Sequence, residues 1–154
     1  MTKSFNLKIA FIQLIASILL FLGIQQFYVI VELDLIELIH SIGKDNFSYY
    51  VQKSDEFGIS EKLKHLSTVK MILSFIGIAL GYIVCSIINF KRQLNWKIAV
   101  LIALICFIIF QFKIINLPIH YIATKNLAIA YFVPAIISIL LSFILYFFSL
   151  RTKP

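Results

Sequence analysis

Residues 71–90 read MILSFIGIALGYIVCSIINF, twenty positions without one charged side chain. An α-helix rises about 1.5 Å per residue, so about 20 apolar residues cross the roughly 30 Å of hydrocarbon in a bilayer. Apolar residues lie on all sides of this run, whereas a strand of a membrane β-barrel is polar at every second position. The run therefore predicts a transmembrane helix.

Further runs of the same kind flank it at residues 9–31, 98–117 and 127–150. The run 98–117 is the least uniform because Gln111 and Lys113 lie near its end, where a lysine stem can extend its ammonium to the headgroups. The chain is 61% hydrophobic and 14% charged, whereas soluble domains have about half and about a quarter. Its polar remainder is too short for a second core. We therefore expect one all-α domain over residues 1–154, an integral membrane four-helix bundle.

The basic residues predict the orientation, because Lys and Arg in short loops stay on the cytoplasmic side. Seven of them lie before the first span, between the second and third, or after the fourth: Lys3, Lys8, Lys91, Arg92, Lys97, Arg151 and Lys153. The other seven share the opposite side with all seven acidic residues, so the charges there cancel. Both termini are expected in the cytoplasm. The basic character then reflects orientation and affinity for anionic lipid, and nucleic acid is not an expected partner.

Aromatic residues support the same arrangement, since their rings favour headgroup depth. The inner boundary is expected at Phe90, Trp96 and 146–148. The outer boundary is expected at Phe27, Tyr28, Tyr121 and Tyr131.

Residues 32–68 form the only sizeable region outside the membrane. Apolar residues recur at helical spacing over 32–42, which predicts an amphipathic helix that ends at Gly43. Ser60 is expected as the N-cap of a second helix, with Glu61 in its first turn. The region is either a short helical cap on the outer face or a docking surface for a partner or ligand, and an amphipathic surface fits both.

The three histidines lie outside the hydrocarbon on the outer side, and two of them have acidic neighbours at helical spacing. Glu37 and His40 are three residues apart, Glu61 and His65 are four apart, and His120 lies between the third and fourth spans. If these five side chains converge, they form a candidate metal site. The same residues also fit ordinary solvated or interfacial side chains, which we expect. No metal and no cofactor is therefore predicted.

The predicted spans contain few residues that could take part in catalysis. No charged residue lies in the central part of any span, although proton relays, transport sites and carboxylate chemistry in membranes depend on such residues. This argues against a proton-coupled antiporter, an intramembrane aspartyl or metalloprotease and a di-iron enzyme. Cys85 and Cys106 lie mid-span with no Cys-x-x-Cys, which argues against a quinone-coupled disulfide oxidase. No catalytic residue is predicted.

Small residues form stripes on two spans, and Gly77 and Gly81 make a Gly-x-x-x-Gly motif that lets a neighbouring backbone approach closely. The predicted helix-packing residues are Ser74, Gly77, Gly81, Cys85, Pro134, Ser138 and Ser142. Pro134 is also expected to kink its helix. Contact inside the bundle is the expected role, and oligomerisation or partner binding is the alternative.

For function we expect a non-enzymatic accessory or interaction subunit of a membrane complex. Its partners would be the lipid bilayer and a membrane protein or a second copy. Small size and a bias toward Ile and Lys favour the cytoplasmic (inner) membrane of a bacterium. Two alternatives stay open. One is a small homo-oligomeric channel or transporter with Gln13, Ser17 or Gln111 along a shared pore. The other is a lipid-processing or metal-dependent enzyme at the outer face, whose lipid substrate enters laterally.

Overall fold

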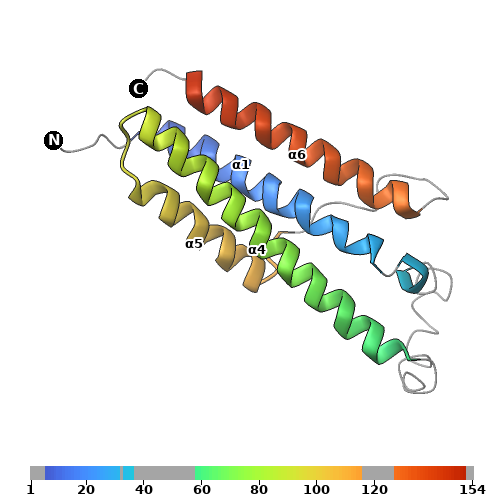
Figure 1. Ribbon diagram of the computed structural model, residues 1–154. Coiled ribbons are helices and arrows are strands. Elements are labelled where there is room, and N and C mark those ends of the chain that lie inside the picture. Colours follow the sequence, from blue (N-terminus) through green and yellow to red (C-terminus); the bar gives the residue numbers. More distant parts are fainter. Residues whose placement is uncertain (1–5, 32, 37–57, 116–126, 152–154) are drawn as a thin grey trace.

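A computed structural model of the protein describes residues 6–31, 33–36, 58–115 and 127–151 (Figure 1). The described residues are mostly helical and include no strand. The elements are α1 (Leu7–Gln25), the 3₁₀ segment η1 (Gln26–Ile30), α4 (Ile59–Lys91), α5 (Lys97–Gln111) and α6 (Leu127–Arg151).

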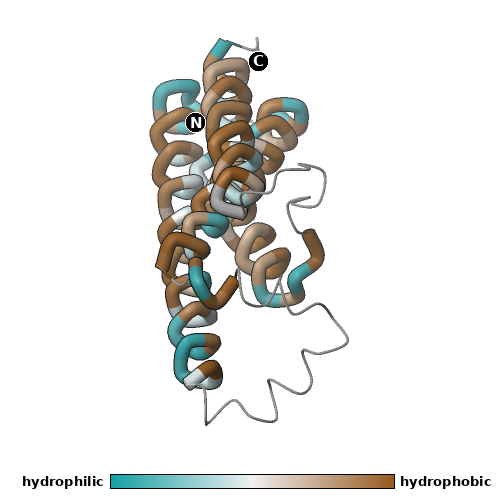
Figure 2. The backbone as a smooth tube through the Cα atoms, turned by 90° about the vertical axis from the view of Figure 1, so that its right-hand side faces the viewer, coloured by the Kyte–Doolittle hydropathy of each residue, from teal (hydrophilic) through white to brown (hydrophobic). Residues whose placement is uncertain are grey.

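Within the described residues, three stretches of helix are long and apolar enough to cross a membrane: Leu7–Ile30, Ile59–Lys91 and Ile129–Arg151. Hydrophobic residues cover the long middle parts of the helices, and hydrophilic residues gather toward their ends (Figure 2). The fourth helix, α5, has 15 residues, about 22 Å, which is shorter than the roughly 30 Å of hydrocarbon. The protein thus has the helices of an integral membrane protein, and α5 covers only part of the predicted run 98–117.

The helix α1 is the central element, because it packs against α4, α5 and α6. Contacts along α1 and the following η1 give the direction of α1 relative to α6. They join Gln13 to Ser149, Ser17 to Tyr146 and, from η1, Tyr28 to Tyr131. The two helices are therefore antiparallel. α4 is also antiparallel to α1, so α4 and α6 run in the same direction (Figure 1).

The helices α4 and α5 end in the same backbone motif, in which a residue after the helix adopts the left-handed conformation. Gln93 follows α4 with a φ of 55°, and Lys113 follows α5 with a φ of 50°. The N–H of Ile114 donates to the carbonyl of Ile109 at 3.2 Å, which satisfies one of the last carbonyls of α5. This motif ends α5 at Gln111, before the predicted end of the span.

The start of α4 differs from the prediction. The N-cap is Gly58, with a φ of 63°, and not Ser60. Ile59 is only 5% exposed, so burying this side chain in the first turn outweighs the capping preference of serine. Glu61 lies in the first turn, as predicted. Of the expected helix 32–42, residues 33–36 are helical. Residues 32 and 37–42 and the expected end at Gly43 lie outside the described residues.

Candidate functional site

Polar side chains of α1, α4 and α6 meet in two layers near the end of the bundle where α1 begins. In the first layer, Gln13 Nε2 donates to Asn89 Oδ1 at 2.9 Å and to Ser149 Oγ at 3.3 Å. One turn further along α1 is the second layer, where Ser17 Oγ lies 2.8 Å from Tyr146 Oη and 3.5 Å from Cys85 Sγ. Each layer takes one residue from each of the three helices.

Both layers are buried inside the bundle: Gln13 and Asn89 of the first layer are 0% exposed, and Ser17 and Tyr146 of the second are 3% exposed. Hydrogen bonds between membrane helices contribute about 0.6 to 2 kcal/mol each. Gln13 Oε1 and Asn89 Nδ2 are buried without a hydrogen-bond partner, so the first layer is not fully satisfied. The arrangement fixes the register of three helices within one chain, and it directs Gln13 and Ser17 toward α4 and α6.

Tyr146 departs from the expected aromatic belt. Its side chain is buried, and its hydroxyl is engaged with Ser17 instead of facing the headgroups. The C-terminal end of α6 is capped by a residue that follows α4: Arg92 Nη1 donates a hydrogen bond to the carbonyl of Ser149. The last carbonyls of a helix have no partner within it, so Arg92 serves as a cap from another element.

The four predicted packing residues of α4 are all buried: Ser74, Gly77, Gly81 and Cys85. A Cβ built on Gly77 would lie 2.6 Å from Phe21 Cα, and one built on Gly81 would lie 3.3 Å from Ser17 Cβ. The stripe therefore meets α1. On α6, Ser138 and Ser142 are buried and Pro134 is partly buried inside the helix.

Gly23 is a close-packing residue that no sequence pattern predicted. A Cβ there would lie 2.7 Å from Ile139 Cγ1 and 2.9 Å from the carbonyl oxygen of Ala135. It therefore sets the approach of α1 to α6. Four residues to either side of Gly23 are Leu19 and Phe27, so no small-residue stripe marks the position in the sequence.

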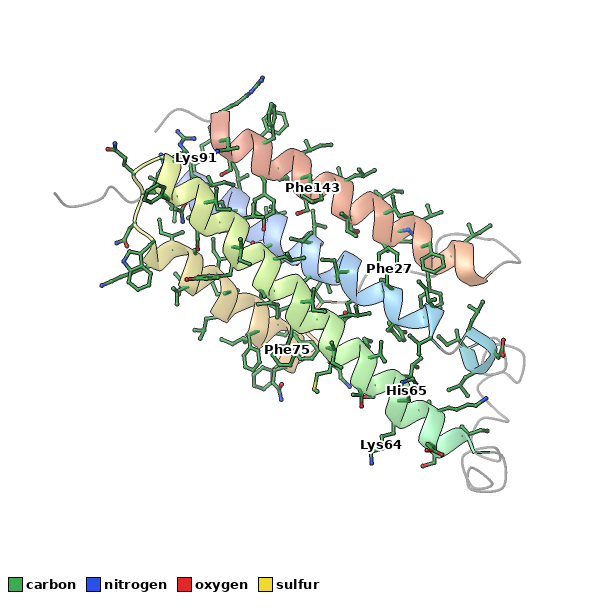
Figure 3. All side chains as sticks on the ribbon, viewed as in Figure 1. Phe27, Lys64, His65, Phe75, Lys91 and Phe143 are labelled. Carbon is green, nitrogen blue, oxygen red and sulfur yellow. The ribbon has the colours of Figure 1, made fainter. Side chains whose placement is uncertain are left out.

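A pocket of about 470 Å³ lies at the opposite end of α1, between α1, α4 and α5. Its polar lining residues are Gln25, Tyr28, Ser67, Lys70, Gln111 and Lys113, and the rest of its lining is apolar. The pocket exists because α5 stops early. The Phe75 ring lies 6.0 Å from the ring of Phe107 and 5.8 Å from that of Phe110, so α4 continues beyond the last turn of α5 (Figure 3).

Two lysines, Lys70 and Lys113, give this pocket a positive charge. The ammonium of Lys70 lies 5.0 Å from the ring centroid of Tyr28, a cation–π distance. Lys113 is close enough to repel the charge of Lys70. Among the described residues that line the pocket, none has an acidic side chain. The sequence predicted Lys113 only at the end of a span, because the spacing of Lys70 and Lys113 along the chain does not reveal their proximity.

The candidate metal residues are only partly described. Glu61 and His65 are exposed near the start of α4, where Figure 3 labels His65 beside Lys64. Glu37, His40 and His120 lie outside the described residues. Among the residues that the structure does describe, no group of three or more His, Cys, Asp or Glu side chains could hold a metal ion. Convergence of the five residues stays a hypothesis for metal analysis to test.

The comparisons with known proteins add no relative. Comparison with protein-family models, with curated proteins and with solved structures found no match to this chain.

Proposed function

We propose that the protein is a non-enzymatic accessory or interaction subunit of a membrane complex. One observation carries the proposal: two polar side chains of α1 bind polar side chains of α4 and α6 inside a single chain. Gln13 and Ser17 on α1 are bound to Asn89, Cys85 and Tyr146 on α4 and α6. Side chains held in this way position helices, and the sequence has no charged residue in the centre of a span to support chemistry there.

The same observation favours the accessory role over a homo-oligomeric channel. A pore between copies needs polar side chains on an outward surface of each copy, whereas Gln13 and Ser17 are buried. Gln111, the third residue considered for a pore, lines the pocket between α1, α4 and α5. Gln13 and Ser17 therefore give no support to a shared pore, and the exposed Gln111 is the one residue of the three left for it.

The proposed topology has four crossings with both termini in the cytoplasm of a bacterial-type inner membrane. α4 and α6 run in the same direction, so the chain between them has to return across the membrane. α5 supplies part of that return, although it is shorter than a full span. The lysines and arginines at the proposed inner side support the orientation.

The proposed surface for the partner lies on α6. α6 packs mainly on α1, whereas α4 contacts both α1 and α5. The side chains of Leu140, Phe143 and Ile144 are exposed on α6 and form an apolar surface. Close packing of another helix on such a surface is driven by van der Waals contact and not by the hydrophobic effect, since lipid is equally apolar.

The experiment is site-specific photocrosslinking in intact membranes. A crosslinker replaces Leu140 on α6, which is 56% exposed, and a matched control replaces Leu104 on α5, which is 55% exposed. We expect a discrete protein adduct from position 140 and none from position 104, with the adduct identified by mass spectrometry. An adduct of two copies of the chain would favour the homo-oligomer. The absence of a protein adduct at both positions, with no protein co-purifying in mild detergent, would refute the proposal.

A further inference from the structure

We propose that the pocket between α1, α4 and α5 binds one anionic phospholipid, with the phosphate between Lys70 and Lys113 and an acyl chain against the apolar lining. The proposal does not depend on the accessory role, because it rests on the geometry and charge of this pocket alone. Three features carry it: the depth of the pocket, its charge and its shape.

The depth is that of a lipid headgroup. Lys70 directly precedes the charge-free run of α4 that begins at Met71. Lys113 follows the apolar helix α5 by two residues. Both lysines thus lie next to the end of an apolar helical stretch, and their stems can extend the ammonium groups to the depth of phospholipid phosphates.

The positive charge of the two pocket lysines favours a bound anion. Lys70 and Lys113 repel each other, and in the part of the lining that the structure describes no acidic side chain offsets them. The face of Tyr28 partly stabilises Lys70. A phosphate between the two lysines replaces this repulsion with two attractions. Tyr28, Gln25 and the hydroxyl of Ser67 add polar groups to the same lining.

The shape suits an acyl chain below the phosphate. The lining includes Phe21 and Leu22 of α1, Met71 of α4, and Ile109 and Phe110 of α5. These residues belong to the apolar parts of their helices, so they continue the hydrocarbon region into the pocket. A volume of about 470 Å³ falls in the range of small-molecule sites, roughly 300 to 1,000 Å³. A soluble anion would use the lysines but leave this apolar part unfilled.

The test compares lipid binding by purified protein, with native mass spectrometry as the readout. The probes are phosphatidylglycerol and the zwitterionic phosphatidylcholine, titrated into protein in mild detergent. The variants are the double substitution Lys70→Gln/Lys113→Gln and a matched control, Lys62→Gln/Lys64→Gln, which removes the same charge from exposed positions of α4. Each lysine near a lipid surface contributes about a fivefold change in affinity. We expect about 25-fold weaker phosphatidylglycerol binding in the first variant and less than about twofold in the control.

Two further measurements distinguish a bound lipid from a bound soluble anion and from general attraction between basic residues and anionic lipid. Ser67→Trp keeps both lysines and fills the pocket from an exposed position, so it should also abolish selective binding of phosphatidylglycerol. It provides a second test if the double variant does not fold. Glycerol phosphate should compete only weakly, because it lacks the acyl chains. Equal binding of the two lipids by the wild-type protein, equal losses in both double variants, retained binding in Ser67→Trp, or full competition by glycerol phosphate would each overturn the proposal.

Discussion

Replacing Gly77 with alanine should push α1 and α4 apart, whereas the same change at Gly81 should not. The added Cβ at Gly77 would lie 2.6 Å from the Cα of Phe21, a backbone atom that no rotamer change can move. At Gly81 the nearest atoms are the Cβ and Oγ of Ser17, both at 3.3 Å, and a shift of a few tenths of an ångström relieves that contact. The two positions lie one turn apart on the same helix face, so each is a control for the other.

The size of the effect follows from opposing contributions. Restoring an ordinary carbon–carbon distance of about 3.6 Å at Gly77 needs a separation of roughly 1 Å, and a gap of this size loses a quarter to a half of each dispersion contact along the interface. Overpacking of this kind costs about 1 to 3 kcal/mol. Alanine offsets about 1 kcal/mol through its better helix propensity. At Gly77 the clash is with a backbone atom, so the cost belongs in the upper part of that range, about 2 to 3 kcal/mol, and after the offset Gly77→Ala should lower the free energy of unfolding by about 1 to 2 kcal/mol. At Gly81 a cost near the lower end, about 1 kcal/mol, is balanced by the offset, so Gly81→Ala should change the free energy of unfolding by less than about 0.5 kcal/mol.

The assay is reversible unfolding in mixed detergent micelles, followed by circular dichroism for both variants and the wild-type protein. If neither variant changes the free energy of unfolding, the backbones of α1 and α4 are farther apart than described. A larger loss in Gly81→Ala than in Gly77→Ala would refute the register of α1 against α4.

Three other predictions concern separate parts of the molecule. Cysteines introduced at Lys64 and Lys91, which lie near opposite ends of α4 (Figure 3), should differ in labelling by an impermeant reagent added to intact cells. Only Lys64→Cys should react, and the reverse result would invert the topology. Tyr146→Phe should lower the free energy of unfolding by about 0.5 to 1.5 kcal/mol, because Ser17 loses its 2.8 Å partner; no loss in the same unfolding assay would contradict that hydrogen bond. Elemental analysis of untagged protein should find well under one equivalent of zinc, iron or manganese. A full equivalent that is lost in His40→Ala/His65→Ala would establish the metal site.

The long helices could be predicted from the sequence because a helix that crosses lipid requires an uninterrupted run of apolar residues. This requirement predicts α4 around residues 71–90 and α6 close to its described bounds. It does not determine how far α4 continues into water, because the first turns of α4 are polar and depend on their own contacts. The early end of α5 could not be predicted either. It depends on Lys113 in a left-handed conformation, which is normally a glycine position.

The site was less predictable than the fold, since it depends on which helices are neighbours. The stripe around Gly77 indicates that some backbone comes close, but only the structure identifies Phe21 on α1 as the contact. Tyr146 lies near the end of a span, where tyrosines usually contact the lipid headgroups, yet its hydroxyl is hydrogen-bonded to the buried Ser17. Lys70 and Lys113 are 43 positions apart in the sequence, and no local pattern reveals that one pocket contains both.

The central position of α1 has a consequence for biosynthesis. Among the described helices, α1 leaves the ribosome before the others, and α6, which supplies Tyr146 and Ser149 to the polar residues of α1, leaves after them. At about 5 to 20 residues per second, the delay is on the order of ten seconds. During that interval Gln13 and Ser17 lack part of their final hydrogen bonding, so nascent α1 needs shelter from lipid, either at the insertion machinery or beside α4. A chain that stops before α6 would retain the need for that shelter, which makes it a natural substrate for membrane quality control.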